Sequence, residues 1–322
     1  MSAGEIQRIV SLFSSGTIAE PKRIYFSRGD LQRTVDFFTE GMSLMCSPGD
    51  TVAILLPCHV PDGVGDLLSR GLKKLGAEVL ELGVVTQVGE FLPTLQQRRP
   101  NVMVGMPWQI RLLALAAPEL RPDVVLLSAD YVPQSIASVI TAQWGCEVLT
   151  HFGMTETCFG CAVESLLHEG MHLRRDEIYA EIINPVSGKV LPDGETGELV
   201  LTTLRREAMP LIRYRTGDFA RLSPHHTGRI MWVDGRITIP RAFYELQERF
   251  CRLPWLYDYS ATDTDGVFDI TAEVSFSAPQ NFRAVLINEI VNVYSLPPSS
   301  IRLRTEFAVS GNAYMYKREK RI

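Results

Sequence analysis

Apolar positions in the first half of the chain recur with two periods, one typical of helices and one typical of buried strands. Between residues 31 and 45 they fall three or four apart, which predicts an amphipathic helix. Further helices are predicted at 62–75, 91–97 and 109–116, and buried strands at 51–57, 77–82, 101–105 and 124–128. Strands of this kind separated by helices imply an α/β fold with a parallel sheet covered on both faces, which binds ligands at the carboxyl ends of its strands.

The pattern changes after about residue 178, where short runs separated by Gly, Asp and Pro predict antiparallel strands. These runs cover 178–183, 198–203 and 209–214, in a β-rich part that extends to about residue 235. Beyond a hinge near 234–240, the patterns predict a helix, a strand, a helix and a strand at 243–252, 268–276, 280–294 and 301–307. We therefore expect a large domain over 1–235 and a small α/β domain over 236–322.

The composition is that of a globular protein, with 46% hydrophobic residues, 21% charged residues and a formal net charge of −5 over 322 residues. It excludes a disordered chain, and the mild acidity offers no field to attract nucleic acid or anionic lipid. The first residues lack the features of a secretory signal, and no apolar run approaches the roughly 20 residues that cross a bilayer. Six scattered cysteines fit a reducing compartment. We expect a cytoplasmic protein with no membrane or nucleic-acid partner.

Three loops carry the residues suited to chemistry, and the first is Ser14–Lys22, ahead of a predicted strand at 23–26. Its hydroxyls and glycine let backbone N–H groups face an anion, and Lys22 adds a positive charge, as a phosphate-binding loop requires. Taken alone, the segment is more typical of an ordinary turn.

The second loop, His151–Glu156, follows an apolar run at 146–149. Phe152 offers a face on which a purine can stack, and Glu156 offers the carboxylate oxygens that Mg²⁺ prefers. Taken alone, a strand that ends at a solvated glutamate explains the same residues.

The third loop closes the segment Pro210–Asp218. A Thr-Gly turn at a strand end fixes Asp218, whose two oxygens can accept hydrogen bonds from adjacent ribose hydroxyls. A plain hairpin turn is an equal alternative for this segment.

In this order, the three loops resemble the phosphate loop, the aromatic-Gly-x-Thr-Glu motif and the Tyr-x-Thr-Gly-Asp motif of adenylate-forming enzymes. The amino-acid sequences of four segments are similar to those of the phenylacetate-CoA ligase branch of that superfamily: Gly170–His172, Glu181–Glu195, Gly197–Leu204 and Pro210–Asp218. The resemblance is clear from about residue 11 to residue 236 and is thinner beyond.

The resemblance implies a two-step reaction, in which a small carboxylic acid attacks ATP to give an acyl adenylate and a thiol, usually that of coenzyme A, displaces AMP. Carried over position by position, it assigns the phosphates to Ser14, Ser15, Gly16, Thr17 and Lys22. It also places adenine at Phe152, the α-phosphate at Thr155, Mg²⁺ at Glu156, and the ribose at Asp218 and Arg236.

Several positions depart from the family pattern. Ile18 and Ala19 stand where the family's phosphate loop has a threonine and a glycine. The hinge aspartate and the lysine-glycine loop of the thioester step are missing, because Ile237–Arg241 leads straight into the next helix. The family's final catalytic lysine has no match after Gly311. Lys317 is a candidate substitute, and a solvated basic tail is an equal alternative.

Cys158 and Cys161, followed by His168 and His172, have the residue types and the short spacing of a zinc site. Their position beside Glu156 favours packing or the lining of a substrate pocket, so zinc is the lesser alternative.

We expect an ATP-dependent, AMP-forming acid-thiol ligase for an aryl or other hydrophobic acid, with an acyl pocket built from 104–112 and 128–132. Met106, Trp108 and Tyr131 are candidates for its lining. Two alternatives stay open: a non-catalytic nucleotide-binding relative that acts as a sensor or partner-binding protein, and an adenylating enzyme with another acyl acceptor. Since the family has a further segment before the phosphate loop, a homodimer or a partner chain that completes the first lobe is also expected.

Overall fold

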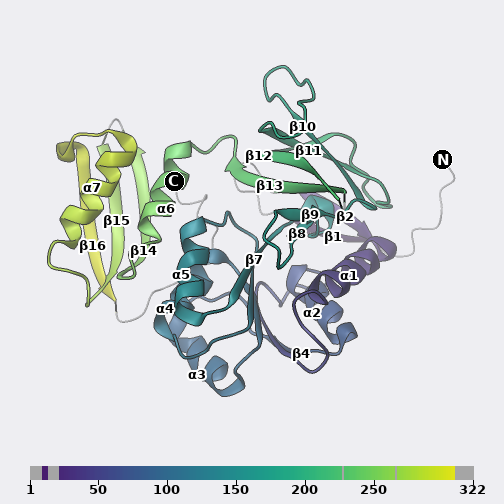
Figure 1. The fold of residues 1–322 in the computed structure, drawn as a ribbon, viewed down its shortest axis with the longest axis horizontal. Coiled ribbons are helices and arrows are strands. Elements are labelled where there is room, and N and C mark those ends of the chain that lie inside the picture. Colours follow the sequence, from purple (N-terminus) through teal and green to yellow (C-terminus); the bar gives the residue numbers. More distant parts are fainter. Residues whose placement is uncertain (1–8, 14–21, 227, 265–266, 309–322) are drawn as a thin grey trace.

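The computed structural model describes residues 9–13, 22–226, 228–264 and 267–308 (Figure 1). Within these ranges the strands form a two-stranded hairpin, an eleven-stranded mixed sheet and a three-stranded sheet. The hairpin pairs β1 (Ile9–Phe13) with β2 (Arg23–Ser27), on either side of the candidate phosphate loop. No helix in the described ranges is long and apolar enough to span a membrane.

Five parallel strands form one end of the large sheet, in the order β4, β3, β5, β6, β7. Their bounds are β3 (Thr51–Leu55), β4 (Glu78–Glu81), β5 (Val102–Gly105), β6 (Val124–Leu127) and β7 (Glu147–Phe152). Helix α1 (Arg28–Met42) precedes β3, and the helices between the strands are α2 (Val64–Leu75), α3 (Val88–Arg98), α4 (Pro107–Ala116) and α5 (Gln134–Trp144). The predicted parallel α/β sheet is therefore confirmed.

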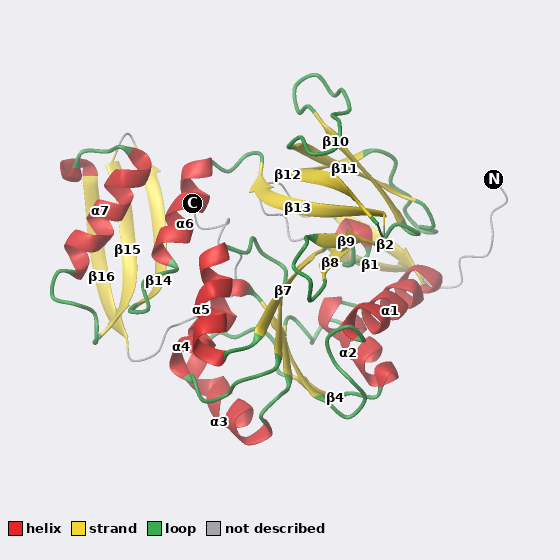
Figure 2. Ribbon diagram, in the orientation of Figure 1, coloured by secondary structure: helices red, strands yellow, loops and turns green. Residues whose placement is uncertain are grey.

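The two faces of this parallel sheet belong to two separate hydrophobic cores. Val52 and Ile54 pack with α1 and α2, whereas Ala53 and Leu55 pack with α4 and α5. Because successive side chains of a strand point to opposite faces, helices on both faces bury the whole strand. Figure 2 shows the two helical layers on either side of the sheet.

The sequence analysis did not predict α5, although Ile136, Ile140 and Trp144 recur at the helical spacing of four residues and are buried. Pro133, which precedes α5, offers no capping side chain, so the usual local start signal of a helix is missing. The backbone N–H groups of Gln134 and Ser135 donate instead to the carboxylate of the distant Glu248, at 2.6 and 2.9 Å.

β7 also joins the parallel strands to an antiparallel part, because it pairs with β8. The remaining strands of the large sheet are β8 (Ala162–Glu164), β9 (Met171–Leu173), β10 (Ile178–Ile183), β11 (Gly197–Thr203), β12 (Tyr214–His225) and β13 (Gly228–Arg236). The predicted strand at 209–214 is wrong, since β12 begins only at Tyr214. Pro210 lacks a backbone N–H, and Arg213 has a left-handed φ of 49°, so neither suits a regular strand.

The three-stranded sheet near the C-terminus, which we call the C-terminal sheet, has the order β14, β15, β16 and is covered by two helices. The elements are α6 (Arg241–Phe250), β14 (Leu256–Thr264), β15 (Val267–Ser275), α7 (Phe282–Tyr294) and β16 (Ile301–Ala308). The sequence analysis did not predict β14. Four residues separate β13 from α6, which confirms that 237–241 leads straight into the helix.

Candidate active site

A tyrosine hydroxyl links a lysine to a glutamate where the hairpin meets the large sheet. Lys22 Nζ, just before β2, donates to the Tyr214 hydroxyl at 3.0 Å, and that hydroxyl donates to Glu156 Oε1 at 3.1 Å. The hydrogen bond to Tyr214 is the main reason why the pKa of Lys22 is raised. A cation, a hydroxyl and a carboxylate from three distant segments therefore form one hydrogen-bonded chain.

Asp218 and Arg236 face each other across β12 and β13, where they are register partners. Arg236 Nε lies 3.2 Å from Asp218 Oδ1, and Arg236 Nη1 donates to the carbonyl of Thr216 at 2.8 Å. Gly217, which lies between Thr216 and Asp218, has a φ of +76°, a conformation that glycine adopts without strain. Asp218 and Tyr214 belong to the same strand, β12, so this pair lies along the strand from the Lys22–Tyr214–Glu156 chain.

The loop that joins β7 to Glu156 requires a glycine at position 153. A Cβ there would lie 1.8 Å from the backbone oxygen of Phe159, which no side chain can tolerate. Phe152, the last residue of β7, is half-buried against the core of the antiparallel strands. Thr155 and the buried Glu156 follow in a single turn of 3₁₀ helix, Thr155–Thr157. The loop thus presents Phe152 and Glu156 from a backbone held in one conformation.

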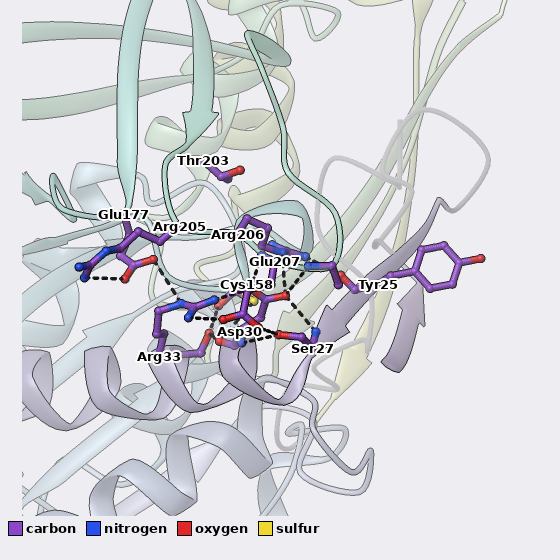
Figure 3. A network of polar contacts seen from close by, with 12 residues as sticks. Tyr25, Ser27, Asp30, Arg33, Cys158, Glu177, Thr203, Arg205, Arg206 and Glu207 are labelled. Atoms are coloured by element: carbon purple, nitrogen blue, oxygen red, sulfur yellow. Dashed lines mark hydrogen bonds and ion pairs between the residues drawn. The ribbon is translucent and has the colours of Figure 1, made fainter. Parts of the chain in front are cut away.

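A buried arginine, Arg206, ties this loop to the hairpin; Figure 3 shows it beside Tyr25 of β2 and Asp30 of α1. Arg206, whose side chain is 4% exposed, donates to the carbonyl of Glu156 at 2.8 Å and to that of Tyr25 at 3.0 Å. Its guanidinium also lies 4.5 Å from the centroid of the Phe26 ring, which adds a cation–π contact. The turn that carries Glu156 is therefore fixed to β2, the strand that leads out of the candidate phosphate loop.

Asp30 anchors the same network from the first turn of α1. Its carboxylate accepts hydrogen bonds from the backbone N–H of Ser27, Glu207 and Ala208, at 2.9 to 3.1 Å. Burial alone would raise the pKa of Asp30, but these backbone donors outweigh it and lower the pKa. Sequence reasoning missed Asp30 and Arg206 as part of the site, because their partners lie far away along the chain.

A cavity, partly open to solvent, lies between α1, α2 and the sheet, next to the end of β7. Its walls are apolar except for Ser128 and His151, whose Oγ and Nδ1 are 2.8 Å apart. Burial lowers the pKa of His151 to about 4, so the imidazole is neutral at pH 7. The cavity is thus a site for an apolar group with one polar corner.

The residues expected to line an acyl pocket divide between this cavity and other cores. Val104 and Ser128 line the cavity. Trp108 instead packs edge-on against Tyr259 of the C-terminal sheet, and Tyr131 lies 4.5 Å from the ring of Tyr244. Met106 is buried in the core beneath α1 and α2 but is not part of the cavity wall. Trp108 and Tyr131 were predicted from their place in the segments 104–112 and 128–132, but both side chains pack against the C-terminal part of the chain.

The structure brings together several of the residues predicted from sequence, namely Lys22, Phe152, Thr155, Glu156, Asp218 and Arg236. Ser14, Ser15, Gly16, Thr17 and Lys317 lie outside the described residues. Tyr214 was quoted only as part of a motif, and its place between Lys22 and Glu156 is visible only in the structure.

The structure does not support the zinc alternative. Cys158 Sγ contacts the carbonyl of Asp30, and Cys161 is fully buried in a different core, where burial raises its pKa to about 12. His168 is held between two glutamates, and His172 contacts Ser165. Among the described residues, no group of three or more His, Cys, Asp or Glu side chains is arranged to hold a metal ion.

Comparison with known proteins gives a consistent family signal. The family model described as AMP-binding enzyme matches residues 7–204. The chain is 30% identical over 240 residues to phenylacetate-coenzyme A ligase of Pseudomonas putida, and 31% identical over 241 residues to that of Escherichia coli (strain K12). Each alignment covers 70% of this chain and 53% of the relative, so the chain spans about half the length of the curated relatives it matches.

Solved structures share the fold at low sequence identity. A 2-hydroxyisobutyryl-CoA ligase in the postadenylation state has a TM-score of 0.77 at 18% identity, over 98% of this chain and 72% of that one. A benzoate CoA ligase from Burkholderia xenovorans LB400 has a TM-score of 0.65 at 18% identity, over 96% of this chain and 67% of that one. At such identities the likeness establishes the fold.

Proposed function

The chain belongs to the family of AMP-binding enzymes, and from this premise we propose that it is an AMP-forming ligase that joins an aryl carboxylic acid to coenzyme A. The observation that carries the proposal is the convergence of Lys22, Glu156 and Asp218 from distant segments on one place. The similarity to phenylacetate-CoA ligases supports an aryl acid as the substrate and coenzyme A as the acceptor.

In this proposal Asp218 and Arg236 hold the ribose, and the face of Phe152 holds the adenine. The Asp218 carboxylate offers oxygens to the ribose hydroxyls while Arg236 Nε keeps it oriented, 3.2 Å away. Lys22, together with Ser14, Ser15, Gly16 and Thr17, neutralises and orients the phosphates, and Thr155 contacts the α-phosphate. Lys317 would act at the α-phosphate as well.

Glu156 fits a magnesium ion, because a carboxylate held in a buried turn supplies the hard oxygen that this metal prefers. When bound there, Mg²⁺ would neutralise the negative charge of the phosphates. Tyr214 and Arg206 would keep the Glu156 side chain and backbone in place through the hydrogen bonds described above.

The chemistry needs positioning more than it needs an acid or a base. A carboxylate oxygen of the substrate forms a bond to the α-phosphorus of ATP, and the bond to pyrophosphate breaks. The thiol sulfur of coenzyme A then bonds to the acyl carbon, and AMP leaves. ATP supplies the leaving group, so the residues accelerate the reaction by holding the reactants in line and by offsetting charge.

The apolar cavity beside His151 is the proposed pocket for the acyl group. It lies at the end of β7, directly before the loop that carries Glu156, and its walls suit an aromatic ring. The aromatic ring of the acid would lie between α1 and the sheet, and its carboxylate would point toward Glu156 and Lys22.

The experiment that tests this proposal is the exchange of labelled pyrophosphate into ATP over a panel of aryl acids. We expect acid-dependent exchange that falls at least tenfold in Glu156→Gln and in Asp218→Ala. Glu195→Gln, at an exposed glutamate, is the matched control and should exchange like the wild type. Absence of exchange with every acid, while AMP still binds, would instead favour a nucleotide-binding sensor.

A further inference from the structure

The polar corner of the cavity, formed by Ser128 and His151, lies near the end of β7, where His151 packs against Phe37 and Phe38 of α1. The imidazole ring lies 6.4 Å from the ring centroids of both Phe37 and Phe38. Of the side chains that line the cavity, those of Ser128 and His151 alone carry a hydrogen-bonding group. A ligand in this cavity therefore meets hydrogen-bonding side chains at one place.

One of the two ring nitrogens of His151 is buried without a hydrogen-bond partner in the described part of the chain. Nδ1 pairs with Ser128 Oγ at 2.8 Å, whereas Nε2 is sealed from solvent and pairs with none of the described residues. Buried polar atoms are nearly always satisfied in proteins, so an unpaired one on a side chain that lines a cavity points to a partner that binds beside it.

The imidazole can serve as either a donor or an acceptor at Nε2. The ring is neutral at pH 7, because burial disfavours the charged form. In a neutral imidazole one nitrogen donates and the other accepts, and a serine hydroxyl satisfies Nδ1 in either role. A hydroxyl group on a ligand can likewise donate or accept, so it fits both tautomers of His151.

We infer that His151 is a specificity-determining residue, whose Nε2 forms a hydrogen bond with a hydroxyl group on the ring of the bound acid. The substrate class is then a hydroxylated aryl acid. This inference rests on the proposed function, since it requires that the cavity hold the acyl group. It goes beyond the proposed function because His151 would distinguish among aryl acids by a ring hydroxyl group, which takes no part in the reaction.

The preference should be visible in the wild-type enzyme. We expect kcat/KM in pyrophosphate exchange to be about 10- to 100-fold higher for one of the ring-hydroxylated isomers than for the unsubstituted acid, as one buried hydrogen bond predicts. Benzoate and phenylacetate, each compared with its three ring-hydroxylated isomers, form the panel. Equal or better use of the unsubstituted acids would overturn the inference.

Two variants of equal shape separate hydrogen bonding from packing. In His151→Gln the side-chain amide can still donate and accept, whereas in His151→Met a side chain of similar length cannot. We expect the ratio of kcat/KM for the hydroxylated acid over the unsubstituted acid to stay well above one in the Gln variant. In the Met variant it should fall to near one. A ratio that stays high in the Met variant would contradict the role of His151.

The outcomes also separate this inference from the proposed function. If no acid supports exchange in the wild type, the proposed function fails first. If exchange occurs but the unsubstituted acids are preferred, the ligase stands and the assignment of His151 is wrong. Since the wild-type ratio decides this point, the test holds even if a variant fails to fold.

Discussion

Arg111 offers a quantitative test of how the C-terminal sheet is attached to the rest of the molecule. This arginine lies on α4 and is fully buried. Its guanidinium donates to the carbonyls of Cys251, Leu253 and Leu256 at 2.9, 2.7 and 3.1 Å. It also lies 4.9 Å from the centroid of the Trp108 ring. We predict that Arg111→Met, which keeps most of the apolar stem, destabilises the fold severely.

The size of the effect follows from the three carbonyls that lose their donor. An unsatisfied buried acceptor costs about 1–3 kcal/mol. Two of the acceptors, the carbonyls of Cys251 and Leu256, belong to fully buried residues, whereas the carbonyl of Leu253 still accepts from the backbone N–H of Leu256 at 3.1 Å. We therefore expect a loss of about 3–5 kcal/mol, which is a large fraction of the typical stability of a protein.

Urea unfolding followed by circular dichroism measures this loss directly, because it does not depend on the fluorescence of Trp108. Arg252→Met is the matched control, since Arg252 is exposed at the end of α6, and it should change the stability by less than about 0.5 kcal/mol. If both variants unfold within about 1 kcal/mol of the wild type, the reasoning about Arg111 is refuted.

Three further predictions concern the site itself. Gly153→Ala forces a methyl group onto the Phe159 carbonyl, so thermal melting should show a loss of several degrees and calorimetry a loss of AMP binding; a fully active variant would contradict the loop geometry. The pKa of His151 is about 4 in the folded protein, against an ordinary value of 6.5. Between these two pH values the imidazole therefore binds a proton in the unfolded chain but not in the folded protein. Stability should therefore fall by about 2 kcal/mol between pH 7 and pH 5 in urea unfolding, a fall that His151→Met should lack. Tyr214→Phe breaks the link to Glu156, so kcat/KM in pyrophosphate exchange should drop about 3- to 10-fold, and an unchanged rate would exclude a role for the hydroxyl.

Much of the fold could be predicted from the sequence where burial leaves a periodic signal. The strand at 51–55 is buried on both faces and reads as a continuous apolar run, so its place in a parallel sheet was predictable. Helix α5 was missed because no neighbouring residue marks its start: its N-terminus is capped by Glu248, which lies 114 residues beyond Gln134. The strand expected at 209–214 failed because the apolar residues there precede β12 in an irregular segment.

The candidate site was predictable only in part, because its contacts join residues far apart in sequence. Glu156 and Asp218 were found through their motifs, which are short and local. Arg206 holds the carbonyl of Glu156 from 50 residues away, and no local pattern marks a lone arginine for that role. The unpaired nitrogen of His151 is likewise a property of the folded cavity, since it depends on what α1 and the sheet place around it.

The central claim, that this chain activates a carboxylic acid with ATP, is tested most directly by mass spectrometry of the enzyme mixed with ATP, Mg²⁺ and an aryl acid in the absence of coenzyme A. We predict an enzyme-bound acyl adenylate whose mass equals that of the acid plus AMP less one water. Formation should depend on the acid and should be lost in Asp218→Ala. ATP that stays intact with every acid, on an enzyme that binds the nucleotide, would contradict it.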